Sequence, residues 1–150
     1  MLKGIDHRLN AEVLHCLRAM GHGDVLVISD TNFPSDAVAR DSTIGQLLRM
    51  ENLSAPAAIE AILTLLPLDD FVDDHVTRME VVGDAGALPA VQTEVQAVID
   101  AAEGRARPMV SVERFEFYDR ARASYAVIQT GERRVYGCFL LRKGVIPPES

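Results

Sequence analysis

The chain has 150 residues, of which 48% are hydrophobic and 25% charged, the size and composition of one globular domain spanning residues 1–150. Its net charge of -7 repels a phosphate backbone, so nucleic acid is excluded as an expected partner. No apolar run reaches the ~18 residues of a membrane span, and the first residues lack a signal-peptide pattern. We therefore expect a cytoplasmic protein without a membrane partner.

The first third of the chain predicts a helix, a buried strand and a loop. Residues 10–20 place apolar side chains on one stripe, Asn10 can cap this helix, and the glycines that follow permit it to end. Residues 25–29, VLVIS, are too short and too apolar for anything but a buried strand. Residues 30–43, DTNFPSDAVARDST, have the composition of a long loop, and such loops are usually functional or disordered.

The middle of the chain predicts two more helices and two more strands. Ser54 can cap one helix, and residues 88–102 have the apolar spacing of another, which Gly104 ends. Residues 75–86 indicate a strand that closes in a turn, and residues 109–112 indicate a further short strand.

The last part of the chain completes the predicted sheet. In residues 113–124 the side chains Arg114, Tyr118 and Arg122 recur every four positions, as on one face of a helix. Residues 125–145 predict two strands joined at 130–133, a connection short enough for an antiparallel hairpin. Strands and helices alternate earlier in the chain, which favours parallel pairing there. The predicted fold is a single α/β domain, with a mixed sheet and helices packed on its faces.

Several familiar signatures are missing from the sequence. Cys16 and Cys138 form no CxxC or Cys/His metal pattern, so we expect two reduced thiols, with Cys16 on the buried face of the first helix. His7 and His75 have no motif around them and are expected at the surface. There is no P-loop, no dinucleotide-binding glycine motif, no G-x-S-x-G and no H-E-x-x-H.

Two polar residues flank the first predicted strand. His22 lies between two glycines before it, where an imidazole could transfer protons near neutral pH or could simply be a solvated loop residue. Asp30 ends the strand, where ligands bind in open α/β sheets, but it could equally form an Asx-turn. Asp24 could join His22 as a metal ligand, although no recognisable third ligand accompanies them.

Two further candidates come from the second half of the chain. Arg114 shares a helix face with Tyr118, where its guanidinium could bind vicinal hydroxyls or form an ordinary surface salt bridge. Tyr136 precedes Gly137, whose missing side chain lets another group approach the backbone, although an aromatic at a strand start is more often a packing residue.

Three blocks in order, MGHGDVLVISDTNFP, RFEFYDRA and TGERRVYGCFLLRKGV, together with the opening MLKGI, resemble the fucose mutarotase and D-ribose pyranase family, most closely its fucose branch. The likeness covers essentially the whole chain. It implies an enzyme that interconverts the anomers of a free monosaccharide without a cofactor or a metal. The family also implies a homo-oligomer, a ring or a larger assembly such as a decamer, with sites near subunit contacts.

The resemblance also implies roles for individual residues. The proton donor falls on His22, and the acid that binds sugar falls on Asp30. Arg114 stands where the ribose branch has a histidine, which favours L-fucose or a related hexose. The family's last sugar contacts fall on Tyr136, a possible second proton carrier, on Gly137, and on residue 138, where Cys138 replaces an asparagine. A thiol is a weaker hydrogen-bonding group than an amide, so residue 138 bears on which sugar is bound.

Two other functions remain open from the sequence. The first is a sugar-binding or transport-associated protein that keeps the pocket without turnover, a reading that Cys138 makes conceivable. The second is a small metal-dependent hydrolase that uses His22, Asp24 and Asp30 as ligands.

Overall fold

The computed structural model describes residues 1–149, which form five helices and six strands. The helices are α1 (Ala11–Ala19), α2 (Ser35–Arg40), α3 (Ala55–Leu63), α4 (Ala90–Glu103) and α5 (Arg114–Arg122). The strands are β1 (Val25–Ser29), β2 (Leu48–Met50), β3 (Val76–Met79), β4 (Val110–Val112), β5 (Ala126–Thr130) and β6 (Phe139–Arg142). In residues 1–149 no helix is both long enough and apolar enough to cross a membrane.

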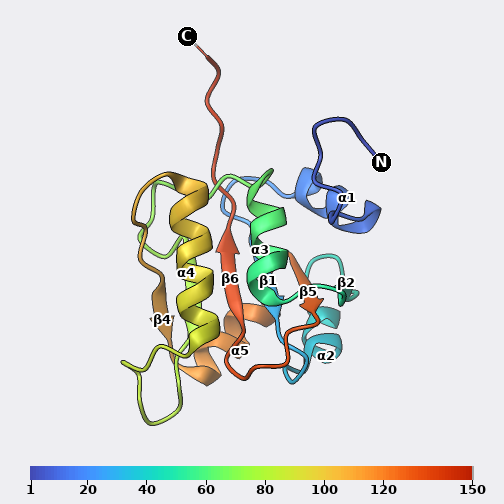
Figure 1. The fold of residues 1–150 in the computed structure, drawn as a ribbon. Helices are drawn as coiled ribbons and strands as arrows, with labels where there is room; N and C mark the ends of the chain where they lie inside the picture. Colours follow the sequence, from blue (N-terminus) through green and yellow to red (C-terminus); the bar gives the residue numbers. More distant parts are fainter. Residues whose placement is uncertain (150) are drawn as a thin grey trace.

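The strands form one mixed sheet in the order β2-β5-β1-β6-β3-β4 (Figure 1). β1 and β5 run parallel, as do β2 and β5, and β3 and β4. β6 is antiparallel to both of its neighbours, β1 and β3. The predicted α/β class and the mixed sheet are therefore confirmed.

The predicted hairpin between the last two strands is wrong, because β1 lies between β5 and β6. β1 is buried along nearly its whole length, so its backbone needs hydrogen-bonded neighbours on both sides. The segment 131–138 makes the crossing possible by passing over the end of β1, where the Thr31 N–H donates to the Glu132 carbonyl at 2.9 Å. This crossing brings segment 131–138 against the residue that follows β1.

Alternate residues of β1 pack into two separate hydrophobic clusters on the two faces of the sheet. Leu26 and Ile28 lie in the larger cluster with buried residues of α1, α3 and α4. Val27 lies in the smaller cluster with buried residues of α2 and α5, including Phe117. In Figure 1, α3 and α4 cover the front of the sheet, while α5 lies at its lower end. The core therefore fixes β1 from both sides.

Local signals predicted the helix ends well. The side chains of Asn10 and Ser54 accept hydrogen bonds from Val13 N–H and Ala57 N–H as N-terminal caps, and Gly104 follows α4 in the left-handed conformation with φ 68°. The loop predicted over residues 30–43 is shorter than expected, because residues 35–40 form α2, which buries Val38 and Ala39 on the sheet.

Candidate active site

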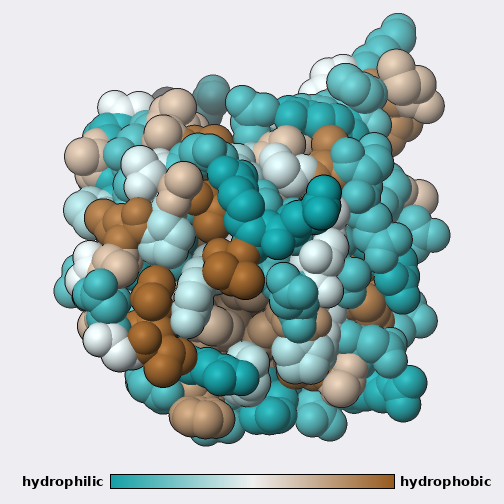
Figure 2. Space-filling view, turned by 60° about the horizontal axis from the view of Figure 1, so that its bottom comes forward, coloured by the Kyte–Doolittle hydropathy of each residue, from teal (hydrophilic) through white to brown (hydrophobic). Residues whose placement is uncertain are grey.

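A pocket of about 460 Å³ opens at the carboxyl end of β1, within the usual size range of small-molecule sites. Its polar lining comes from Asp30, Asn32, Arg114, Tyr118 and Tyr136, and its apolar walls include Phe33, Met79 and Val135. This is the lower end of the sheet in Figure 1, which Figure 2 turns toward the reader and where apolar side chains lie among hydrophilic ones. The pocket thus joins the end of β1, the start of α5 and the segment before β6.

Asp30 is almost completely buried beneath the pocket, with 3% of its surface exposed. Its Oδ1 accepts the N–H groups of Asn32 and Phe33, both at 2.9 Å, and its Oδ2 accepts the Gly137 N–H at 3.1 Å. The Asx-turn expected as the alternative role is therefore present. The same carboxylate lines the pocket, and carboxylate oxygens have further lone pairs for a ligand.

Tyr136 has a φ of 63° and is the only non-glycine residue within 1–149 with a positive φ. A left-handed backbone costs a residue with a side chain roughly 1–2 kcal/mol, and such strain concentrates at functional sites. Two contacts hold the residue: the Gln92 amide donates to its carbonyl at 3.1 Å, and its hydroxyl accepts the Val82 N–H at 3.2 Å. The surrounding structure therefore imposes the orientation of the phenol ring.

Arg114 lies on the same face of α5 as Tyr118, as predicted. Its Nε donates to the Tyr118 hydroxyl at 3.3 Å, and its guanidinium carbon lies 5.5 Å from the centre of the Tyr118 ring. Glu113 instead caps α5 by accepting the N–H groups of Phe115 and Glu116. Arg114 forms no salt bridge with any carboxylate of residues 1–149, so its remaining donors are available to a ligand at the pocket.

Cys138 is a free, buried thiol at the base of the pocket. Burial raises its pKa well above the usual range, and the negative charge of Asp30 adds to that rise. The side chain is therefore a protonated thiol at neutral pH, hydrogen-bonded to Asp30. It presents one weak donor where an asparagine would present an amide.

His22 does not reach this pocket in its own chain. It lies at the opposite end of β1, a separation of ~16 Å for five residues in a strand. There its Nε2 is 3.2 Å from Asp69 Oδ2, and its ring meets Phe71 edge-on at 5.5 Å. The structure brings together five of the predicted site residues, which are Asp30, Arg114, Tyr136, Gly137 and Cys138, and leaves His22 apart.

A metal site built from His22, Asp24 and Asp30 is wrong, because Asp30 and His22 lie at opposite ends of β1. Asp24 instead accepts the Gly21 N–H at 2.7 Å. Within the part of the chain that the structure describes, no three His, Cys, Asp or Glu side chains are grouped to hold an ion.

Two buried polar residues near these groups were missed from the sequence. Gln92 is fully buried on α4, and besides Tyr136 it also donates to the Met79 carbonyl at 2.7 Å. A polar residue beside Val91 and Val95 on the apolar face of a helix was the available signal. Asp69 occurs in a run of acidic residues that is typical of a solvated loop, so no local pattern distinguished it.

Comparison with known proteins agrees with this geometry. The chain is 40% identical to the fucose mutarotase of Homo sapiens over 97% of this chain and 94% of the relative. The crystal structure of protein Atu2016 superposes with a TM-score of 0.96 at 62% identity, covering 98% of this chain and 97% of that one. The fucose mutarotase in complex with L-fucose from Streptococcus pneumoniae superposes with a TM-score of 0.87 at 32% identity, covering 97% and 100%. Finally, the model of the RbsD / FucU transport protein family matches residues 3–146, so the chain belongs to that family.

Proposed function

We propose that this protein is a cofactor-independent mutarotase that interconverts the α and β anomers of a free monosaccharide, with L-fucose as its preferred substrate. The observation that carries the proposal is the convergence of the Asp30 carboxylate, the Arg114 guanidinium and the Tyr136 hydroxyl on one pocket. These groups suit a small ligand rich in hydroxyls. The names of the human relative and of the Streptococcus pneumoniae complex support L-fucose as the sugar.

The reaction needs only proton transfers. The ring oxygen gains a proton while the anomeric hydroxyl loses one, the bond between the anomeric carbon and the ring oxygen breaks, and an open-chain aldehyde forms. Rotation of the carbonyl and the reverse transfers then close the ring as the other anomer. One acid and one base of suitable strength suffice, each contributing on the order of 10²-fold to the rate.

The pocket residues divide this work. Asp30 accepts hydrogen bonds from sugar hydroxyls, and Arg114 donates to their oxygens. The Tyr136 hydroxyl accepts the Val82 N–H, which leaves its own proton free for the sugar. Phenols are poor bases at neutral pH, so Tyr136 acts as a donor.

His22 completes the site from a second copy of the chain. The pocket of one copy contains no imidazole, whereas His22 is half-exposed at the other end of the sheet. Large apolar side chains stand exposed near both ends: Phe71 beside His22 is 72% exposed, and Val135 at the pocket is 61% exposed. Such side chains mark surfaces that meet other proteins. The protein therefore works as a homo-oligomer, a ring or a larger assembly, in the cytoplasm.

Saturation-transfer NMR on free L-fucose tests the proposal. Wild-type protein should accelerate exchange between the anomers, and the His22→Ala and Asp30→Asn variants should slow it on the order of 10²-fold. A panel of other hexoses and D-ribose establishes the preference. If no free sugar, L-fucose included, exchanges faster with the protein, the proposed function is wrong.

A sugar-binding protein without turnover is the second candidate, and Cys138 is the observation that favours it. Its thiol replaces an amide beside Asp30 and so changes the hydrogen bonds offered to a sugar. Calorimetric affinity for L-fucose and the exchange rate, measured on one sample, separate the two functions. Tight binding with the uncatalysed exchange rate would favour the binding protein.

A further inference from the structure

The carboxylate beside His22 belongs to Asp69, which is as deeply buried as Asp30, with 3% of its surface exposed. Its Oδ2 lies 3.2 Å from His22 Nε2, and its Oδ1 accepts the Phe71 N–H at 3.0 Å. Burial alone would raise the pKa of Asp69, but the Phe71 hydrogen bond and the contact with His22 outweigh it and lower the pKa. Asp69 is therefore an ionised acceptor facing one nitrogen of the imidazole.

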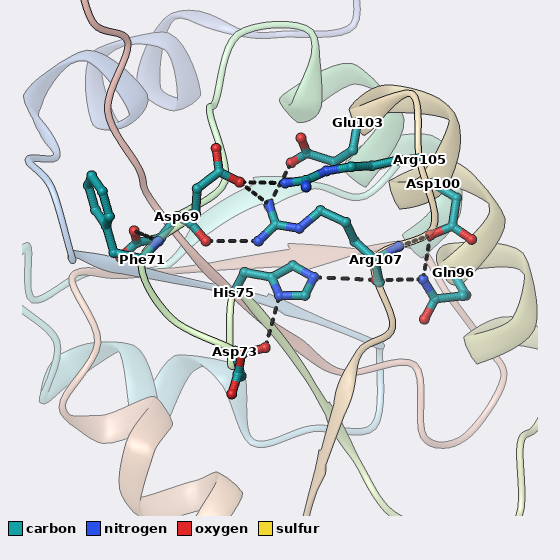
Figure 3. A network of polar contacts seen from close by, with 10 residues as sticks. Asp69, Phe71, Asp73, His75, Gln96, Asp100, Glu103, Arg105 and Arg107 are labelled. Carbon is teal, nitrogen blue, oxygen red and sulfur yellow. Dashed lines mark hydrogen bonds and ion pairs between the residues drawn. The ribbon is translucent and has the colours of Figure 1, made fainter.

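The backbone of Asp69 is held by two partners from distant parts of the chain. The Arg107 Nη2 donates to the Asp69 carbonyl at 2.9 Å, and the Asp69 N–H donates to the Arg142 carbonyl of β6 at 3.1 Å. Figure 3 shows the Arg107 side chain reaching across to Asp69 from the segment that follows α4. The position of the carboxylate is thus set by the sheet and by Arg107 together.

Arg107 is itself fixed by a buried polar network on α4. Its N–H donates to Asp100 Oδ1 at 2.9 Å, and its carbonyl accepts from the Gln96 amide at 2.8 Å. The His75 Nε2 lies 3.3 Å from the same carbonyl (Figure 3). The expectation of a surface His75 is wrong, because this ring is 4% exposed and packs inside the network. The network therefore holds the 69–75 segment against α4.

We propose that Asp69 is the positioning residue of His22, a role that rests on the proposed mutarotase function. A neutral imidazole has one N–H, and a carboxylate at Nε2 holds that proton there. Nδ1, which has no protein partner within residues 1–149, is then the nitrogen that exchanges protons with the sugar. In the forward step the Nδ1 proton of the imidazolium moves to the ring oxygen, and Asp69 stabilises the imidazolium charge before that transfer.

Three chains test the assignment: wild type, Asp69→Asn and the control Asp73→Asn. The control makes the same chemical change in the same loop, at an exposed residue whose carboxylate has no hydrogen bond or ion pair within residues 1–149. Asp69→Asn should lower kcat for L-fucose exchange at least about 10-fold, and it should leave KM unchanged because Asp69 does not line the pocket. Asp73→Asn should keep the wild-type values. A wild-type kcat for Asp69→Asn, in a protein that loses activity with His22→Ala, would overturn the proposal.

Imidazole nitrogen NMR of the wild-type protein without sugar gives a readout that requires neither activity nor a variant. The neutral His22 ring should carry its proton on Nε2, and Asp69→Asn should change this tautomer population. A wild-type ring with its proton on Nδ1 would overturn the proposal even if Asp69→Asn fails to fold. Failure of the proposed function is recognised separately, by wild-type protein that does not accelerate exchange of any sugar.

Discussion

Asp30 Oδ2 accepts the backbone N–H of Gly137 at 3.1 Å and so joins two segments 107 residues apart in the sequence. This one hydrogen bond fastens the strand-end carboxylate to the Tyr136–Cys138 segment. Both sides of the pocket floor depend on it, because Asp30 and Tyr136 line the cavity from these two segments.

Replacing Gly137 by alanine should damage this junction. A Cβ there would lie 2.9 Å from Glu132 Cγ and 3.3 Å from the Arg134 carbonyl, so the segment must shift away from Asp30. We expect a loss of roughly 1–3 kcal/mol in the free energy of unfolding and about 10-fold weaker L-fucose binding. Denaturant titration and calorimetry measure the two effects. Gly86→Ala is the control, because its Cβ would meet no atom within 4 Å; equal losses in both variants would contradict the steric explanation.

Mixing two inactive variants should restore activity if the site is shared between copies. His22→Ala keeps its pocket and Asp30→Asn keeps its histidine, so an assembly of both contains some intact sites. Co-refolding equal amounts should make about one quarter of the sites complete, since each half is intact in half of the copies. The exchange rate of the mixture measures this. Co-refolding His22→Ala with the double variant is the control, and a mixture no faster than that control would place His22 outside any shared site.

Tyr136→Phe should separate proton donation from pocket shape. The variant keeps the ring and loses the hydroxyl, so kcat for L-fucose exchange should fall on the order of 10²-fold while KM changes little. Tyr125→Phe is the matched control, because Tyr125 packs against the larger hydrophobic cluster away from the pocket. A normal kcat in Tyr136→Phe would leave the phenol as a shape-determining residue only.

Both thiols should resist alkylation in the folded protein. Burial raises the pKa of Cys16 to about 11 and raises the pKa of Cys138 further from its usual value, with the Asp30 charge contributing. Because the thiolate is the reactive form, iodoacetamide at pH 8 should label neither residue until guanidinium unfolds the chain. Mass spectrometry of peptides reads out each site. Rapid native labelling of Cys138 would show that its pocket wall opens.

Acid should destabilise the protein partly through Glu132. Hydrogen bonds from Arg134 hold the pKa of this buried carboxyl below its ordinary value of 4.5. A lowered folded-state pKa means that its contribution is complete above pH 4.5 and is lost as the pH falls through the lowered value. Denaturant titrations from pH 7 to pH 3 should show this loss, and Glu132→Gln should remove part of it. Glu94→Gln, at the exposed partner of Arg134, should change the curve less; an unchanged slope in Glu132→Gln would contradict the assignment.

The sequence predicted those features that depend on near neighbours in the chain. Asn10, Ser54 and Gly104 mark helix ends through contacts within a few residues, and Asp30 was placed correctly because a strand end fixes its side of the sheet. The position of β6 was missed because pairing between distant strands leaves no local pattern.

The site was predicted in part for the same reason. Arg114 and Tyr136 were found through the family resemblance, and the structure adds why they are held where they are. Gln92 and Asp69 escaped notice because a buried polar side chain is defined by partners that the fold brings from elsewhere, such as Met79 and His22. The distance between His22 and Asp30 could be anticipated from the five strand residues between them. Its consequence for a shared site became visible only with the pocket.

The position of β6 also orders the events of folding. β6 is the last strand in sequence, yet it fills the gap between β1 and β3, so the two halves of the sheet stay unjoined until it inserts. A nascent chain that ends before residue 139 therefore exposes two unpaired strand edges, the kind of surface on which chaperones act. Tyr136, Gly137 and Cys138 immediately precede β6, so the step that closes the sheet also assembles the pocket.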